Sequence, residues 1–227
     1  MRWEKKLILL LSIISDLEII HSQNLIHRDL HSGNILLNSL CDAYIADLGL
    51  TISADAQSDG IYGVLPYVAP EVLKGKPYTT VSDIYSFGII MWEILCGKPI
   101  SYNQSPMLLK YQICANNLRP TIIEKTPQSY KDLMKACWDN EPEKRPSAKD
   151  IIEAFTKWKD NKEIMAELTN FVKTINSKSP KNINSNSPCE TNAEHEPFTG
   201  SKFIPFEGKL FSKLVNFQTN YEKIQII

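Results

Sequence analysis

The stretch H-R-D-L-H-S-G-N-I-L-L, residues 27–37, joins charged and polar side chains directly to a short apolar run. The apolar pieces at 35–37 and 43–46 predict the two strands of a small β-hairpin. Acidic residues flank this hairpin, because Asp29 comes before it and Asp47 follows it. The sequence therefore predicts that one small hairpin separates two acidic sites.

The residues upstream of this stretch carry an apolar helical pattern over 3–22. Apolar side chains recur three or four residues apart, at Leu7, Leu10, Leu11, Ile14, Leu17 and Ile20. This spacing predicts an amphipathic helix that buries one side in the core. A basic start followed by leucines also resembles a signal peptide, but polar residues interrupt the run, it lacks a small-residue cleavage site and it is too short to span a bilayer. We therefore expect a core helix and no membrane association.

The residues downstream of the hairpin form a long irregular stretch and then several helices. Residues 47–78 carry Gly, Pro, Asp and Ser without a sustained period, which predicts a long functional loop. The stretch 82–95 is apolar on most faces, so we expect a central buried helix that ends at Gly97. Further helical patterns follow at 105–115, 127–138 and 147–158. The predicted fold class is mainly α, with a small β-hairpin.

The composition of the chain changes beyond residue 160. We expect 1–160 to form one lobe, followed by an extra helix over 161–175. Residues 176–197 are dominated by polar side chains, which cannot offset the entropy lost on ordering, so we predict a disordered linker. The last segment, 198–227, regains Phe and Leu. It is expected to be a flexible tail, with a docking segment for another protein as the alternative.

The overall composition narrows the functional classes. The 227 residues include 25 basic and 26 acidic side chains, a formal net charge of −1, which provides no broad positive field for nucleic acid. The five cysteines are scattered and odd in number, without the paired spacing of a zinc site. We therefore expect free thiols and a cytoplasmic protein, with the nucleus as the alternative, and no nucleic-acid partner.

Four ordered motifs carry a resemblance to a known family. They are H-R-D-L-H-S-G-N at 27–34, D-L-G at 47–49, A-P-E at 69–71 and D-I-Y-S-F-G at 83–88. Their order and spacing resemble the signatures of eukaryotic protein kinases. Residues 3–158 are similar to the C-terminal lobe of such a kinase, and the motif sequences look most like the tyrosine-kinase-like group. The resemblance implies a protein-kinase-like C-terminal lobe with the small hairpin next to its catalytic loop.

The resemblance implies ATP and Mg²⁺ as cofactors and a protein hydroxyl as the phosphate acceptor. Asp29 would orient this hydroxyl and accept its proton, a role worth roughly 10²–10⁴-fold in rate. Asp47 would bind the Mg²⁺ that bridges the phosphates, and Asn34 would hold a second ion. His27 and Arg28 would support the loop, and Arg28 could pair with a phosphorylated residue.

Further roles follow from the same resemblance. Leu36 would form the floor under the adenine. Asp83 would cap the backbone of the catalytic loop, with an ordinary helix N-cap as the local alternative. Glu71 would pair with Arg145, with two solvated surface charges as the alternative. Two histidines receive no role: His21 and His195.

The sequence also departs from the family. His31 and Val64 stand where serine/threonine kinases have a Lys and a Thr that contact the transferred phosphate and the catalytic Asp. His31 is therefore included among the predicted nucleotide-binding residues, and the choice between Ser/Thr and Tyr substrates stays open. Leu48 replaces the family's Phe and is expected to keep an apolar plug. The segment 47–71 offers four candidates for phosphorylation: Thr51, Ser53, Ser58 and Tyr62.

The resemblance does not include the glycine-rich loop or the strand lysine of the N-terminal lobe. Those parts position the phosphates, and such positioning is worth about 7–11 kcal/mol in favourable cases. We therefore expect a protein kinase by family whose present chain is weakly active or inactive. The alternative is a non-catalytic, pseudokinase-like module. It would bind a protein through its tail or through the upper surface, where helix 3–22 and hairpin 35–46 leave apolar residues uncovered.

Overall fold

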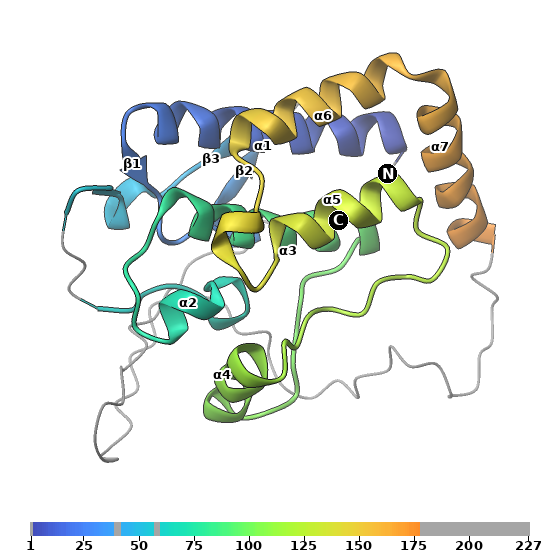
Figure 1. The fold of residues 1–227 in the computed structure, drawn as a ribbon. Coiled ribbons are helices and arrows are strands. Elements are labelled where there is room, and N and C mark those ends of the chain that lie inside the picture. The colour runs from blue at the N-terminus through green and yellow to red at the C-terminus, as the bar shows by residue number, and fades with distance from the viewer. Residues whose placement is uncertain (1, 39–41, 57–59, 178–227) are drawn as a thin grey trace.

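The computed structural model describes residues 2–38, 42–56 and 60–177, and its fold is mainly helical (Figure 1). Helix α1 (Trp3–Ser22) packs on α6 (Ala148–Asp160), and the two lie side by side along one edge of the molecule. Helix α3 (Thr80–Cys96) runs through the centre and contacts both α1 and α5 (Gln128–Cys137). The predicted mainly α fold class is confirmed.

Helix α3 is the buried helix that the sequence predicts. Every residue from Ser82 to Leu95 is buried, including Phe87, Ile90 and Met91 with no exposed side-chain surface. The helix begins with a capping box between Thr79 and Ser82 and ends at Gly97, whose φ of 68° suits a residue without Cβ. The remaining elements pack around it.

The predicted hairpin is present as β2 (Ile35–Leu37) paired antiparallel with β3 (Ala43–Ile45). A second ladder, which the sequence analysis did not predict, joins β1 (Leu25–Ile26) to β4 (Ile52–Ser53). The stretch 47–78 is therefore not simply a loop. It contains β4 and three short helical elements, η2 (Leu48–Leu50), η3 (Leu65–Tyr67) and α2 (Pro70–Leu73). Elements of two to four residues are too short to show a period in sequence.

The remaining helices lie within two residues of their predicted bounds at either end. They are α4 (Pro106–Ala115), α5, α6 and α7 (Lys162–Ser177); a short turn, η4 (Pro142–Lys144), precedes α6. Helix α7 packs on α1 and α6 and buries Leu168 and Phe171. The predicted linker and tail lie, apart from the last two residues of α7, outside the described residues, as do Ser58 and His195.

The first turns of α1 are anchored in the core. The Lys6 Nζ is buried and donates a hydrogen bond of 2.9 Å to the Leu95 carbonyl oxygen, near the C-terminal end of α3. This end of a helix attracts positive charge. The Trp3 ring packs edge-on against Tyr130, with ring centroids 5.1 Å apart. Within the described ranges, no helix combines the length and apolar character needed to cross a bilayer.

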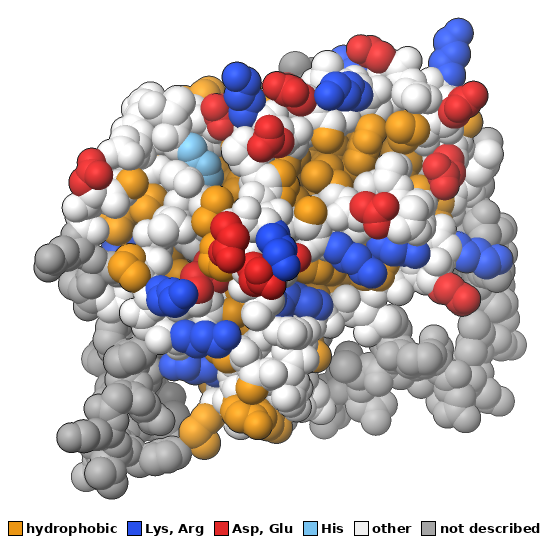
Figure 2. All heavy atoms as spheres, in the orientation of Figure 1, with side chains coloured by type: hydrophobic (Ala, Val, Ile, Leu, Met, Phe, Trp, Pro, Cys, Tyr) orange, Lys and Arg blue, Asp and Glu red, His pale blue; other side chains and the backbone are white. Residues whose placement is uncertain are grey.

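Acidic and basic side chains alternate over most of the face shown in Figure 2, in keeping with the near-zero net charge. Apolar side chains gather on this face over α4, at its lower end. Three of them are strongly exposed: Met107 at 56%, Leu108 at 45% and Tyr111 at 60%.

Candidate active site

The backbone before the hairpin is held by one buried carboxylate on α3. Asp83 accepts hydrogen bonds from the backbone N–H groups of His27 (2.9 Å) and Arg28 (3.0 Å). These bonds stabilise an unusual backbone, because Arg28 has a φ of 68°. Asp83 therefore caps this loop as the resemblance implied, whereas the helix N-cap is Thr79.

His21 also belongs to this support, although the sequence analysis gave it no role. Its Nε2 lies 2.9 Å from the Asp83 Oδ2, and both side chains are almost fully buried. The sequence signal was weak, since a histidine at a helix end has no characteristic spacing to an aspartate 62 positions later.

Asp29 and Asn34 are in direct contact. The Asn34 Nδ2 donates to the Asp29 carbonyl oxygen at 2.9 Å and to its carboxylate Oδ2 at 3.3 Å. Because the amide nitrogen of Asn34 faces Asp29, the amide oxygen is on the other side of the group and can serve a cation. The turn η1 (Ser32–Asn34) that separates them therefore brings a carboxylate and an amide oxygen donor to one place.

The residue before Asp47, Ala46, is hydrogen-bonded to both Asn34 and His27 through its backbone. The Ala46 N–H donates to the Asn34 carbonyl oxygen at 2.8 Å, and the Ala46 carbonyl oxygen lies 3.2 Å from His27 Nε2. Since His27 Nδ1 accepts from the Asp29 N–H at 3.3 Å, the proton of a neutral His27 is on Nε2, which donates to Ala46. Asp47 itself is exposed, with its Oδ1 accepting from the Gly49 N–H at 3.2 Å.

These donors fit a magnesium ion bound together with phosphate oxygens. Mg²⁺ prefers oxygen ligands and commonly takes one or two from protein, with phosphates and water completing its shell. Asn34 and Asp47 would supply the protein oxygens. No group of three His, Cys, Asp or Glu side chains suitable for a metal occurs within the part of the chain that the structure describes, so a site made of protein ligands alone is not formed there.

The buried side chain of His31 lies against Asp29. Its Nδ1 accepts from the Gly33 N–H at 3.0 Å, and its Nε2 lies 3.7 Å from Asp29 Oδ1. The imidazole ring also approaches Tyr67, with centroids 5.9 Å apart. Nucleotide binding by His31 stays a prediction.

Two leucines near the site are exposed. Leu36 is 43% exposed on β2, where it pairs in register with Tyr44, itself 49% exposed. Leu48 is 56% exposed, so the expectation that it forms an apolar plug is wrong for this structure. It sits in the short η2 turn after Asp47, a residue with a φ of 58°, and this turn leaves the side chain uncovered.

The segment that follows Asp47 is fixed at its far end by an ion pair. The two terminal guanidinium nitrogens of Arg145, Nη1 and Nη2, donate to the Glu71 carboxylate at 2.7 Å each, and both residues are buried. Arg145 also donates to the carbonyl oxygens of Val81 and Asp139, at 2.9 Å each. The predicted pair is therefore present, and the alternative of two solvated charges is wrong.

A buried polar chain that the sequence analysis missed lies beneath the catalytic loop. The Tyr67 hydroxyl lies 3.1 Å from the Ser32 hydroxyl and donates to Glu93 Oε1 at 2.6 Å, while the Ile100 N–H donates to the same oxygen at 2.7 Å. Burial raises the pKa of Glu93 above its ordinary value, and the bonds from Tyr67 and Ile100 lower it in part. In sequence, Glu93 looks like one acidic residue in an apolar helix, with nothing to reveal its partners.

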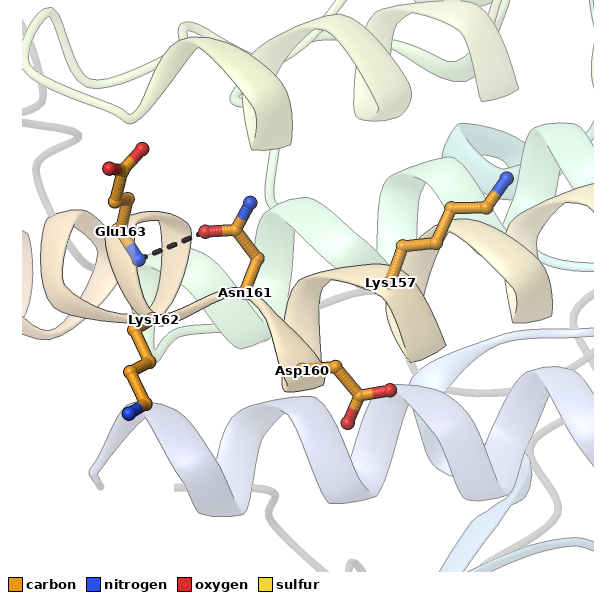
Figure 3. A pocket seen from close by; sticks show the side chains of 5 residues that line it. All are labelled: Lys157, Asp160, Asn161, Lys162 and Glu163. Carbon is orange, nitrogen blue, oxygen red and sulfur yellow. Dashed lines mark hydrogen bonds between the residues drawn. The ribbon is translucent and has the colours of Figure 1, made fainter.

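A shallow hollow lies at the junction of α6 and α7, at the opposite end of the molecule from β1 (Figures 1 and 3). Asn161 in this hollow serves the backbone, because its Oδ1 accepts from the N–H groups of Glu163 (2.9 Å) and Ile164 (3.1 Å). These bonds cap the start of α7, which is an ordinary structural role. The hollow is therefore not part of the candidate active site.

The fold and the ordered motifs together define a protein kinase lobe, with the H-R-D loop, the D-L-G motif and a segment whose far end is held by the Glu71–Arg145 pair. The family model described as protein tyrosine and serine/threonine kinase matches residues 1–155 of the 227. The chain belongs to this family, and it is a protein kinase by family.

Three similar proteins agree with this assignment. The chain is 34% identical to the serine/threonine/tyrosine-protein kinase HT1 of Arabidopsis thaliana, over 68% of this chain and 40% of that protein. It is 34% identical to the human receptor-interacting serine/threonine-protein kinase 3 (63% of this chain, 31% of that protein). It is 35% identical to the dual specificity protein kinase shkA of Dictyostelium discoideum (59% and 27%). The chain thus spans less than half the length of these relatives. Their names are consistent with the resemblance of the motifs to the tyrosine-kinase-like group.

Proposed function

We propose that the intact protein transfers the γ-phosphate of ATP to a serine or threonine hydroxyl of a protein substrate, with tyrosine as the alternative acceptor, in signal transduction. The observation that carries the proposal is the contact between Asn34 and Asp29, together with the two bonds of Ala46 that join the residue before Asp47 to Asn34 and His27. A base for the hydroxyl and two oxygen ligands for metal are what this reaction needs.

Each side chain of the candidate site has a proposed role that fits its burial and its hydrogen bonds. Asp29 is 3% exposed and anchored by Asn34, so its carboxylate is oriented before a hydroxyl arrives. Asn34 and Asp47 would hold Mg²⁺, which when bound neutralises the charge developing on the phosphate oxygens. His27 keeps the loop and Asp47 together through Ala46. Leu36, exposed on β2, would offer apolar contact to the adenine.

The experiment is a radiolabelled ATP transfer assay on the intact kinase with a generic protein substrate. We expect Asp29→Asn to lower the rate about 10²–10⁴-fold, because the amide cannot accept the proton. Asp47→Asn should lower the rate and raise the Mg²⁺ concentration needed for half the maximal rate, because an amide oxygen binds the ion less tightly than a carboxylate. Asp160→Asn, at an exposed carboxylate at the end of α6, is the matched control and should leave the rate unchanged. Full activity of the Asp29 variant would overturn the proposal.

For the 227-residue chain alone we propose weak or no turnover, because the glycine-rich loop and strand lysine of kinases have no counterpart among its motifs. The second candidate is a pseudokinase-like binding module. Four exposed apolar side chains favour it. They are Ile19 (57%) on α1, Leu36 and Tyr44 on the hairpin, and Leu48 directly after Asp47. Binding of a partner protein that is unaffected by Asp29→Asn and Asp47→Asn, in a protein without transfer activity, would favour this second candidate.

A cytoplasmic location, with the nucleus as the alternative, belongs to the same proposal. Support comes from Cys114 and Cys137, which carry free thiols in the described part of the chain. Such thiols are common in reducing compartments.

A further inference from the structure

The guanidinium of Arg28 lies within cation–π distance of two tyrosine rings of the segment that follows Asp47. Its Cζ is 5.4 Å from the ring centroid of Tyr62 and 5.7 Å from that of Tyr78. Both distances are within the range of a cation–π interaction, which is strongest where water is excluded. Arg28 is 9% exposed, so much of the contact is desolvated.

The same guanidinium binds the segment's backbone. Its Nε donates to the Leu50 carbonyl oxygen at 2.6 Å. The backbone N–H of Arg28 is held by Asp83, so the arginine projects from a fixed point on the catalytic loop. Arg28 therefore connects the loop to the segment at two separate places, Leu50 and the tyrosine rings.

Tyr78 adds a second connection within the segment. Its hydroxyl accepts from the Tyr62 N–H at 2.9 Å and donates to the Tyr62 carbonyl oxygen. Tyr78 directly precedes Thr79, the N-cap of α3, so these bonds fix residue 62 to the central helix. Tyr78 is 6% exposed, as expected for a structural anchor.

The residue after Tyr62 lies against the catalytic base. Gly63 has a φ of 113°, and a Cβ built there would be 3.4 Å from Asp29 Oδ1 and 3.5 Å from the Arg28 carbonyl oxygen. A shift of residue 62 would therefore alter the space beside the Asp29 carboxylate. The backbone next to Tyr62 therefore lies close to the Asp29 carboxylate, so the placement of Tyr62 affects the space around this carboxylate.

The geometry points to Tyr62 and Tyr78 as positioning residues that hold the segment beside Asp29 through cation–π contacts of both rings with the Arg28 guanidinium. This inference rests on the proposed function for its catalytic meaning, and it gives Arg28 a task in addition to the phosphate-binding role expected from the sequence. In this arrangement the arginine already orders the segment through aromatic and carbonyl groups.

The experiment varies the ring of Tyr62 in the 227-residue chain and follows amide hydrogen exchange. Three amides report on the segment: Tyr62, bonded to the Tyr78 hydroxyl, and Tyr67 and Val68, bonded within the turn. Tyr62→Phe and Tyr62→Trp keep the negative ring face and should preserve their protection. Tyr62→Leu, and pentafluorophenylalanine at position 62, whose ring face is no longer negative, should speed exchange about tenfold.

The controls separate an electrostatic contact from simple packing. Tyr111→Leu, at a 60% exposed tyrosine of α4, should change none of the three amides. Arg28→Gln should speed exchange and remove the difference between phenylalanine and its pentafluoro form. Equal protection in those two forms with Arg28 present would overturn the inference. This measurement needs no ATP. Evidence against the cation–π contacts of Arg28 would therefore be distinguishable from evidence against the proposed kinase activity.

Discussion

At the scale of single residues, loss of the Glu71–Arg145 ion pair should lower the free energy of unfolding more than loss of any other contact described above. Both partners are buried, and the pair joins the end of segment 47–71 to the turn before α6. A buried charge that loses its partner is not compensated by water, which typically costs about 3–5 kcal/mol. The pair therefore stabilises the arrangement of distant segments rather than one helix.

Arg145→Met should accordingly lower the free energy of unfolding by about 3–5 kcal/mol in urea titrations. The neighbouring Lys144 provides the control, because its ion pair with Glu141 is on the surface, with the two side chains 58% and 53% exposed. Lys144→Met should cost far less, because solvent screens an exposed ion pair. Glu71→Met combined with Arg145→Met should cost less than the sum of the single changes. Equal losses for Arg145→Met and Lys144→Met would contradict the argument.

Glu93 predicts a dependence of stability on pH. Burial raises the pKa of its carboxyl in the folded protein, so the unfolded chain releases this proton at a lower pH than the folded chain. Between those two pKa values the folded state binds more protons, and the free energy of unfolding therefore falls as the pH rises. This contribution is complete below the ordinary glutamate pKa and is lost as the pH passes the raised value.

Glu93→Gln keeps an oxygen acceptor for Tyr67 and Ile100 but does not titrate. Measured from pH 4 upward by urea unfolding, the stability of the native protein relative to this variant should decline. A relative stability that rises with pH would mean that the fold favours the charged carboxylate instead.

At the scale of the helices, the close contact between α3 and α5 depends on Gly88, which has no side chain. A Cβ at Gly88, in the middle of α3, would lie 3.0 Å from Cys137 Cβ and 3.2 Å from the backbone nitrogen of Trp138. Alanine is better than glycine in a helix by about 1 kcal/mol. Here the two helices approach too closely for that benefit to decide the outcome.

Gly88→Ala should therefore destabilise the protein, since overpacking costs about 1–3 kcal/mol. It should also raise the labelling rate of the Cys137 thiol, which is fully buried in the native protein. Gly97→Ala is the comparison, because its φ of 68° costs stability although no atom lies within 4 Å of the added Cβ. That variant should leave Cys137 protected. An increase in stability for Gly88→Ala would show that the helices separate easily.

The whole molecule shows which features the sequence can predict. Long apolar patterns gave α1 and α3 to within two residues, because each repeats over several turns. The β1–β4 ladder was missed because it joins two pairs of residues that lie far apart in the chain. Short elements obtain their structure from neighbours that periodicity does not reveal.

The candidate site follows the same division. Asp29 and Asn34 stand in one motif of the kinase resemblance, and the structure brings them into contact. The placement of the Asp47 side chain beside them stays a prediction of that resemblance. His21 and Glu93 could not be found in this way, since each acts through a partner that only the tertiary structure brings near. The Lys6 side chain looked like part of a basic start, whereas in the fold it bonds to the far end of α3.

The packing of α1 on α6 has a consequence for biosynthesis. A ribosome that adds roughly 5–20 residues per second releases α1 several seconds before the partner helix that covers it. During that interval β1, β3 and α3 can already pack on α1, but the face of α1 that packs on α6 has no partner helix. We expect the nascent chain to need a chaperone at this stage.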